Sequence, residues 1–236
     1  KKVAACVFMP TFNNPLGSTM SESNKQKLVQ LLAELEIPLI EDDVYGPLAY
    51  QGKRPRAAKA FDVNDNVIYC SSFSKIVAPG LRIGWVVAGL YAESIQYHKF
   101  LDNISTAAIP QLTMVEMLAK GNLRRTSLNA ARIYQHRMEL MRRSISQNFP
   151  ASTRISNPQG GFLLWVELPE SIDSVELYER AMEKKIAITP GLLFSAQGQY
   201  RHHVRLSCGA VDVETMKKSI EVLARLCHAM LEGTSD

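Results

Sequence analysis

Short apolar runs alternate with longer segments of helical periodicity in the first half of this 236-residue chain. The apolar runs that fit buried strands lie near residues 37–41, 66–70 and 82–88. The helical segments begin after Ser21, a residue type that caps helices, and continue at 91–105 and 111–120. This alternation predicts an α/β fold with a mostly parallel sheet. In the first helix we expect one packed face made of Leu28, Leu31, Leu32 and Leu35.

The second half follows a different order. Gly121 separates the helix at 111–120 from a long helical segment that ends at Phe149-Pro150. The rest follows the order strand, strand, helix, strand, strand, helix, and the last helix covers 213–231. This order predicts a small α+β domain. We therefore expect three parts, which are the remnant of a large domain at 1–120, a connecting helix at 121–148 and a small domain at 149–236.

One lysine, Lys75, lies between two apolar segments in Tyr-Cys-Ser-Ser-Phe-Ser-Lys-Ile-Val-Ala-Pro-Gly-Leu-Arg-Ile-Gly-Trp, residues 69–85. A desolvated amine is a nucleophile towards a carbonyl carbon. Ser72 and Ser74 supply hydroxyls, and Arg82 supplies a guanidinium that binds anions in forked geometry. These groups predict a phosphate site beside a reactive amine. The alternative is an ordinary strand-end lysine whose amine reaches solvent.

The segments Ser-Phe-Ser-Lys, Pro-Gly-Leu-Arg and Ile-Gly-Trp together resemble the lysine motif of the fold-type-I pyridoxal-phosphate enzymes, the aspartate-aminotransferase superfamily of class I/II. The resemblance implies that Lys75 carries pyridoxal 5′-phosphate on its side-chain amine. It also implies that Ser72 and Arg82 bind the phosphate, with Ser74 among the cofactor-binding residues. The large domain of this superfamily contains a mostly parallel sheet and precedes a small α+β domain.

Two acidic residues and a tyrosine follow the apolar run at 37–41, at the strand end where open α/β sheets bind ligands. In isolation, such a pair fits a turn or a helix cap. The superfamily's Asp-x-x-Tyr pattern matches Asp42 and Tyr45. By this resemblance, Asp42 keeps the pyridine nitrogen protonated and Tyr45 hydrogen-bonds the 3-oxygen of the ring. We expect Asp43 to be a solvated neighbour.

Two further matches involve Asn14 and Arg205. Asn14 opens an Asn-Pro-x-Gly segment, which in the superfamily supplies an asparagine that also contacts the 3-oxygen of the cofactor. Two-residue alternation puts His203, Arg205 and Ser207 on one face of a strand and Val204, Leu206 and Cys208 on the other. Arg205 matches the arginine that clamps the substrate α-carboxylate. The alternative for Arg205 is a surface ion pair.

The superfamily members that the chain resembles are considerably longer. In them, the preceding part of the large domain supplies a glycine turn of the phosphate site, an aromatic ring stacked on the cofactor and a tyrosine lent to the neighbouring subunit. None of these is found here, and the chain opens on Lys1 instead of methionine. We therefore expect the carboxyl-terminal part of a larger protein that forms a homodimer.

Three functional hypotheses follow. The segments Glu-Asp-Asp, Ala-Pro-Gly-Leu-Arg and Pro-Gly-x-x-Phe-Ser most resemble the MocR subfamily of GntR transcriptional regulators, although Asn13-Asn14 replaces a common His-Gln pair. The first hypothesis is an effector-sensing domain that binds an amino compound and reaches DNA only through an absent amino-terminal domain. The second is a free-standing aminotransferase that moves an amino group between an amino acid and a 2-oxo acid. The third is a truncated fragment that binds no cofactor.

Charge and composition bear on which partners and which cellular compartment we expect for this chain. A net charge of +4 gives little support for nucleic-acid binding by this segment, and no apolar stretch approaches the roughly 20 residues that cross a membrane. Four scattered cysteines are typical of reduced core residues, so we expect a cytoplasmic protein. We expect no metal site, because His202 and His203 are neighbours on a predicted strand and would point to opposite faces.

Overall fold

The computed structural model describes residues 3–51 and 53–234, so Lys1 lies outside the described residues. The chain divides into two compact units. Unit 1 comprises Lys1–Asn13 and Thr19–Ala131, and unit 2 comprises Asn14–Ser18 and Arg132–Asp236. The long helix α4 (Asn122–Asn148) contributes to both units. Among the described residues, no helix combines the length and the apolar character that a membrane crossing needs.

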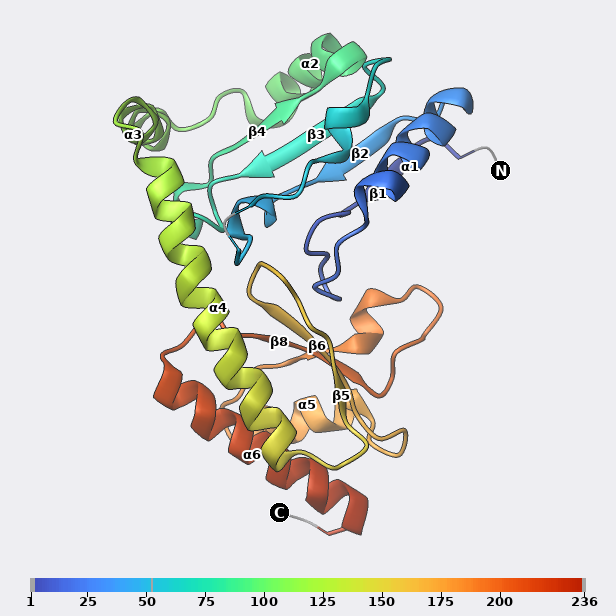
Figure 1. Ribbon diagram of the computed structural model, residues 1–236, viewed down its shortest axis with the longest axis vertical. Helices are drawn as coiled ribbons and strands as arrows, with labels where there is room; N and C mark the ends of the chain where they lie inside the picture. The colour runs from blue at the N-terminus through green and yellow to red at the C-terminus, as the bar shows by residue number, and fades with distance from the viewer. Residues whose placement is uncertain (1–2, 52, 235–236) are drawn as a thin grey trace. The chain divides into compact units, whose positions relative to one another are not determined.

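Unit 1 is built on a four-stranded sheet of order β1-β2-β3-β4, seen as neighbouring arrows in Figure 1. Strands β1 (Cys6–Phe8), β2 (Leu39–Asp42) and β3 (Val67–Ser72) are parallel, and β4 (Gly84–Val87) runs antiparallel to β3. The prediction of an α/β fold with a mostly parallel sheet is therefore confirmed. Parallel pairing brings the carboxyl ends of β2 and β3 to the same edge, with Asp42 opposite Cys70.

Helix α1 (Glu22–Glu34) packs on this sheet through Val29 and Leu32, which join a core with residues of β2 and β3. Its amino end is capped by Ser21, whose side chain accepts a hydrogen bond from the Asn24 amide at 3.3 Å. The predicted leucine face is only partly correct. Leu31 and Leu35 are 52% and 54% exposed, because the buried face is rotated towards Val29.

Lys25 completes the buried face of α1, although it is charged. Its Nζ donates to Thr11 Oγ1 at 2.6 Å and to the Arg56 carbonyl at 2.7 Å. Burial lowers the pKa of Lys25, and the nearby carboxylate of Glu41 opposes this shift. The long aliphatic stem therefore packs like an apolar residue while the amine is satisfied internally.

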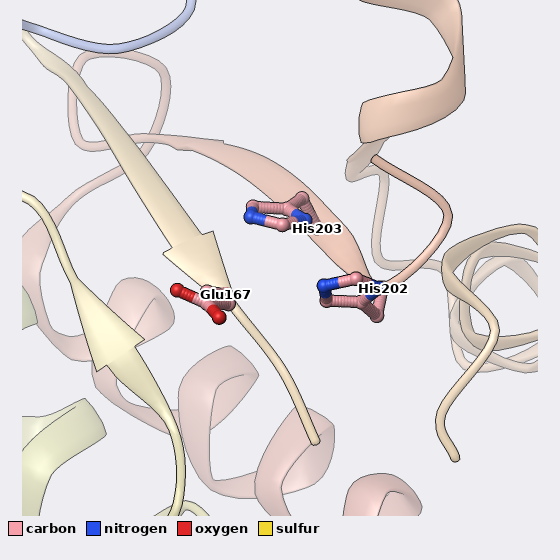
Figure 2. A group of neighbouring side chains, drawn as sticks. All are labelled: Glu167, His202 and His203. Carbon is pink, nitrogen blue, oxygen red and sulfur yellow. The ribbon is translucent and has the colours of Figure 1, made fainter. Parts of the chain in front are cut away.

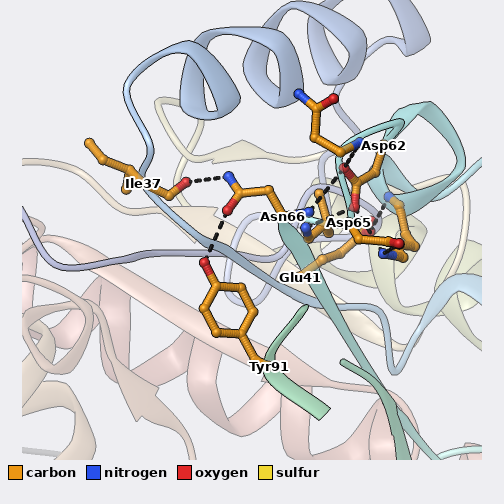
Figure 3. A network of polar contacts seen from close by, with 9 residues as sticks. Ile37, Glu41, Asp62, Asp65, Asn66 and Tyr91 are labelled. Carbon is orange, nitrogen blue, oxygen red and sulfur yellow. Dashed lines mark hydrogen bonds and ion pairs between the residues drawn. The ribbon is translucent and has the colours of Figure 1, made fainter. Parts of the chain in front are cut away.

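Polar contacts fix the segment that leads into β3 (Figure 3). The Asn66 side chain donates to the Ile37 carbonyl at 2.8 Å and accepts from the Tyr91 hydroxyl at 3.1 Å. The Asp62 carboxylate accepts from the Val67 amide at 2.8 Å and from Lys59 Nζ at 2.9 Å. These bonds satisfy buried backbone groups before the strand begins.

The buried carboxylate of Glu41, inside β2, belongs to the same region. It accepts hydrogen bonds from the amides of Ala58 and Lys59, at 2.7 and 2.8 Å, at the start of the short 3₁₀ helix η2 (Ala58–Phe61). Burial raises the pKa of Glu41, whereas these two amides lower it. Glu41 thus ties η2 to the middle of the sheet.

Two further helices of unit 1 follow β4. They are α2 (Ala92–Asn103) and α3 (Ala108–Ala119). No residue of α2 is buried, and in α3 only Met114 is. Gly121, with φ of +65°, ends α3 and allows the turn into α4, as the sequence predicted.

Unit 2 contains an antiparallel sheet of order β5-β6-β8-β7, formed by β5 (Arg154–Ile155), β6 (Leu163–Glu167), β7 (Thr189–Pro190) and β8 (His203–Ser207). Two helices, α5 (Ser174–Glu183) and α6 (Val213–Glu232), bury apolar side chains that include Leu177, Leu223 and Leu226. All four cysteines are free, and Cys208 and Cys227 are buried. The order of strands and helices agrees with that predicted for the second half.

Candidate functional site

The edge formed by the carboxyl ends of β2 and β3 gathers most of the predicted site residues of unit 1. Asp42 ends β2, Ser72 ends β3, and Lys75 follows three residues later. The turn that holds Lys75 is closed by backbone hydrogen bonds from Phe73 to the Ile83 carbonyl at 3.0 Å and from Val77 to the Phe73 carbonyl at 2.8 Å. Burial raises the pKa of the Asp42 carboxyl, and the positive charge of Lys75 is among the influences that oppose this shift.

The Asp42 carboxylate has one oxygen, Oδ1, that is buried without a hydrogen-bond partner among the described residues. Burial raises the pKa of Asp42, and a hydrogen bond from the Val44 amide lowers it. A buried acceptor without a donor is energetically costly unless water or a ligand donates a hydrogen bond to it. A protonated ring nitrogen has the chemistry that this oxygen needs.

The predicted phosphate-binding groups lie on both sides of Lys75: Ser72 ends β3, Ser74 lies in the lysine turn, and Arg82 follows the short 3₁₀ helix η3 (Pro79–Leu81). Arg82 Nη1 donates to Ser74 Oγ at 3.4 Å, and Arg82 itself is exposed. Its backbone φ of +52° is in the left-handed region, a costly conformation for arginine that places its side chain beside the lysine turn. Ser72 lies opposite Gly84 in the β3–β4 ladder, where a Cβ on Gly84 would approach the Ser71 carbonyl to 2.9 Å. Two hydroxyls and a guanidinium therefore flank Lys75 in sequence, and the guanidinium of Arg82 reaches the hydroxyl of Ser74 in the fold.

Tyr45 is 5% exposed and precedes the 3₁₀ helix η1 (Gly46–Leu48), three residues after the end of β2. Its carbonyl accepts from the Leu48 amide at 2.8 Å. Tyr45 thus belongs to the same strand edge as Asp42.

The neighbouring Asp43 differs from its prediction as a solvated residue. It is completely buried, and its Oδ2 forms an ion pair with Arg54 and accepts a hydrogen bond from the Tyr69 hydroxyl at 3.0 Å. Burial first, and then the charge of Asp43, raise the pKa of Tyr69 to about 12. Gly46 is needed here, because a Cβ would lie 2.4 Å from Asp43 Oδ1. Asp43 therefore holds the turn after β2 in place.

Sequence reasoning missed Arg54, the partner of Asp43. It lies in a loop whose sequence gives no sign that the guanidinium turns inward. Arg54 also lines a cavity of about 300 Å³ together with Ile76 and Trp85, all within unit 1. None of the predicted site residues lines this cavity, so we do not assign it to the same site.

In unit 2, Arg205 is held from several sides. Its Nη1 donates to Asn14 Oδ1 at 2.9 Å, its Nη2 donates to Thr189 Oγ1 at 3.0 Å, and its guanidinium lies 5.2 Å from the centre of the Phe194 ring. These hydrogen bonds use two of the five N–H donors of a guanidinium, and the buried Nε has no partner among the described residues. Within residues 3–51 and 53–234 no carboxylate pairs with Arg205, which argues against the surface ion pair.

Asn14 belongs to a short segment, Asn14–Ser18, that is part of unit 2. Gly17 in this segment has φ of +70°, and a Cβ there would approach Pro158 Cβ to 2.8 Å. Only glycine fits that position without strain, which explains the glycine of the Asn-Pro-x-Gly pattern. The segment brings the Asn14 amide to the guanidinium of Arg205.

Comparison with known proteins agrees with this arrangement. The family model for aminotransferase class I and II matches residues 1–223. The chain belongs to this family. The aminotransferase family thus accounts for both the mostly parallel sheet of unit 1 and the antiparallel sheet of unit 2.

The relatives of this chain include both transcriptional regulators and aminotransferases. The chain is 34% identical to an uncharacterized HTH-type transcriptional regulator of Escherichia coli, YjiR, over 98% of its own length and 49% of the regulator. It is 32% identical to aromatic-amino-acid aminotransferase 1 of Thermococcus litoralis, over 95% of this chain and 54% of the enzyme. The chain therefore spans about half the length of the curated relatives that it matches.

A solved structure supports the fold. The multiple substrate aminotransferase of Thermococcus profundus superimposes with a TM-score of 0.92 at 31% identity, covering 99% of this chain and 58% of the enzyme. The fold of an aminotransferase-like domain is thus present, in part, in both units.

The histidines differ from the prediction. His202 and His203 do not point apart, since their ring centroids are 4.5 Å from each other. Strand β8 begins at His203, and His202 lies in the preceding turn, where the alternation of strand side chains does not apply. Burial lowers the pKa of His203, an effect to which His202 adds and which Glu167 opposes. The premise used to exclude a metal site was therefore wrong.

Proposed function

We propose that unit 1 binds pyridoxal 5′-phosphate at the β2–β3 edge, with Lys75 as the residue that carries it. The observation that supports this most directly is the partnerless, buried Oδ1 of Asp42 on a strand end next to Lys75. Asp42 accepts the N–H of the pyridine ring, and Tyr45 hydrogen-bonds the 3-oxygen. Ser72, Ser74 and Arg82 hold the phosphate through their hydroxyls and guanidinium.

We propose that Arg205 of unit 2 binds the carboxylate of an amino compound. A carboxylate takes two parallel N–H bonds from one guanidinium, and Arg205 retains donors beyond those given to Asn14 and Thr189. The two hydrogen bonds and Phe194 orient the guanidinium before a ligand arrives, which reduces the entropy lost on binding. Asn14 orients Arg205, and its contact with the 3-oxygen of the cofactor stays a prediction.

The chemistry of such a site depends on few groups of this chain. Bound pyridoxal phosphate supplies an electron sink that stabilises negative charge on the carbon next to the substrate amine. With the cofactor bound, Lys75 Nζ would accept the proton of that carbon as general base and give a proton back to the bound compound as general acid. Asp42 keeps the ring nitrogen protonated, and Arg205 fixes the carboxylate so that the reacting C–H bond has one orientation.

We propose that this domain senses an amino-compound effector in an HTH-type transcriptional regulator, with DNA bound by sequence outside this chain. The similarity to YjiR supports this assignment. The second candidate is a transaminase, which the similarity to aromatic-amino-acid aminotransferase 1 supports. The residues described here serve either role, because both begin with the same bound amino compound.

Cofactor binding is tested by adding pyridoxal phosphate to the purified chain, recording its visible spectrum, reducing with borohydride and mapping the modified peptide by mass spectrometry. We expect a visible band and a pyridoxyl group on Lys75. Lys75→Ala should lose both, whereas Lys99→Ala, an exposed lysine of α2, should retain them. A label spread over surface lysines, or no band at all, would mean that this chain does not hold the cofactor at the proposed position.

The two roles are separated in the full-length protein by supplying α-amino acids with a 2-oxo acid acceptor. Steady formation of the new amino acid supports the transaminase, and saturable binding without turnover supports the sensor. Arg205→Lys should weaken binding of α-amino carboxylates in both cases, since lysine cannot form the forked contact. Unchanged affinity would show that Arg205 is structural.

A further inference from the structure

Three potential metal ligands meet at one end of the unit 2 sheet, two residues along the strand from Arg205. Glu167 is the last residue of β6, His203 is the first residue of β8, and the two are directly paired in the ladder. His202 precedes β8, and its carbonyl accepts from the Leu168 amide at 2.8 Å, which fixes the turn. One ligand atom from each of Glu167, His202 and His203 lies within 4.8 Å of the others (Figure 2).

The surroundings hold the imidazole of His203 in place. Its ring stacks on Trp165 with centroids 5.2 Å apart and an interplanar angle of 27°, and it meets the edge of Tyr200 at 5.4 Å. A ring packed between aromatic side chains has few alternative rotamers, so little freedom is lost when it binds an ion. Figure 2 shows the rings of His202 and His203 close together, on the side of the strands where Glu167 lies.

Among the described residues, no protein group competes for the nitrogen atoms of these rings. Within residues 3–51 and 53–234 neither imidazole forms a side-chain hydrogen bond, and Nδ1 of His203 is buried as well. Glu167 has one described partner, Arg154, at 3.4 Å, and the Arg154 side chain is 79% exposed. Such an exposed ion pair contributes little, and a carboxylate has a second oxygen for another partner.

We propose that Glu167, His202 and His203 form a binding site for a divalent transition-metal ion such as Zn²⁺. Two imidazoles and one carboxylate are the ligands that Zn²⁺ and its neighbours prefer, whereas Mg²⁺ and Ca²⁺ require mainly oxygen ligands. In a tetrahedral site, bonds of about 2.0–2.2 Å place two ligand atoms of one ion about 3.3–3.6 Å apart. Separations of up to 4.8 Å close by small side-chain rotations, chiefly of the partly exposed Glu167. Three protein ligands leave a fourth position for water or a further ligand.

The site is independent of the proposed cofactor chemistry and is tested without it. Pyridoxal phosphate and amino acids bind metal ions themselves, so the titration uses the untagged chain in a buffer free of both. Isothermal titration with Zn²⁺ should show one saturable site per chain. Mg²⁺ at the same concentrations should show none.

Variants identify the ligands. His202→Ala and Glu167→Gln should each weaken Zn²⁺ binding at least about tenfold, as expected when one of three ligands is lost. His136→Ala removes an exposed histidine of α4 in unit 2 and should leave the affinity unchanged. Circular dichroism of each variant confirms that the fold is retained. Both substitutions are mild, since His202 lies in a turn and glutamine keeps the shape of Glu167.

Three results would overturn the proposal. These are no Zn²⁺ binding, binding that His202→Ala and Glu167→Gln leave unchanged, and equal binding of Mg²⁺. The second result would assign the ion to other residues, such as the free thiols of Cys6 or Cys70.

Discussion

Helix α6 of unit 2 and helix α2 of unit 1 differ in whether their apolar side chains are buried. In unit 2, α6 buries six residues, among them Leu223, Leu226 and Cys227. In unit 1, α2 buries none, and Tyr97, Phe100 and Leu101 are each more than half exposed. Both helices contain apolar residues, so composition does not distinguish them. An apolar stripe on a helix therefore indicates that the helix packs against another surface. It does not indicate that this surface lies in the same compact unit.

The two units also differ in where they place an ion pair. Unit 1 places Asp43 in its interior, completely buried against Arg54 and Tyr69. Unit 2 keeps the ion pair of Asp173 and Arg201 near the surface, with side chains 30% and 65% exposed. Unit 1 therefore adds a buried ion pair, at the carboxyl ends of β2 and β3, to its apolar core, whereas this ion pair of unit 2 lies near the surface.

The largest expected loss of stability comes from replacing a leucine of α6 by alanine, and the same replacement in α2 serves as the comparison. Leu226→Ala should destabilise unit 2 by about 2–5 kcal/mol, because it removes buried methyl groups and leaves a cavity. Leu101→Ala should cost less than about 0.5 kcal/mol, because that side chain already meets solvent. The chain has two tryptophans, Trp85 in unit 1 and Trp165 in unit 2, so each unit can be followed separately.

Urea unfolding measured by fluorescence provides the comparison. A Trp85→Phe background reports unit 2 through Trp165, and a Trp165→Phe background reports unit 1 through Trp85. Similar losses in the two units would mean that α2 is covered in solution, for example by a second copy of the chain, and the contrast between the units would then not hold.

A smaller effect is expected from Asp43→Ala. It leaves the Tyr69 hydroxyl and the guanidinium of Arg54 without their shared acceptor, at a cost of about 1–3 kcal/mol in unit 1. Full loss of a buried ion pair costs more, but the Arg54 side chain is 43% exposed and water can solvate it. Unfolding followed through Trp85 measures the change.

The matched control is Arg56→Ala. Arg56 pairs with Glu22 at 4.0 Å, and both side chains are more than half exposed, so its removal should cost less than about 0.5 kcal/mol. If the two substitutions had equal effects, Asp43 would not be the organising group of the turn after β2.

The sequence predicted the order of strands and helices well, because periodicity and caps are local. Gly121 and Ser21 mark helix ends through their own backbone and side-chain chemistry. The sequence-based predictions of burial were wrong where the burial of a side chain depends on residues far away in the sequence. The burial of Asp43 depends on Arg54, which folds back from a loop, and the exposure of Leu31 depends on how α1 is rotated on the sheet.

In the candidate site too, local features could be predicted from the sequence and contacts between distant residues could not. The motif around Lys75 and the strand ends at Asp42 and Ser72 were accessible from sequence because they are contiguous or follow clear strands. The partners of Arg205 were not, since Asn14 lies far from it in sequence and Thr189 and Phe194 come from a separate strand and turn. The pairing of His202 with His203 was mispredicted because the strand begins one residue later than the alternation assumed.

The smallest expected effect concerns Asp173 in unit 2 and depends on pH. Asp173 caps α5 by accepting from the Val175 amide at 2.8 Å, and it accepts from Arg201 Nη2 at 2.7 Å. Burial acts to raise the pKa of Asp173, but these hydrogen bonds outweigh it, so the pKa is lowered. Because the folded-state pKa lies below the unfolded value of about 3.9, the stabilisation is complete above that pH and is lost as the pH falls through the folded value.

Asp173→Ala should therefore cost about 0.5–2 kcal/mol at neutral pH and less near about pH 3. Asp173→Asn keeps a capping oxygen and should cost less than alanine at neutral pH, the remainder being the charge interaction with Arg201. Urea unfolding followed through Trp165 at both pH values measures these differences. If the loss in Asp173→Ala were the same at both pH values, the carboxylate charge would contribute nothing, and the shape of the cap alone would stabilise the start of α5.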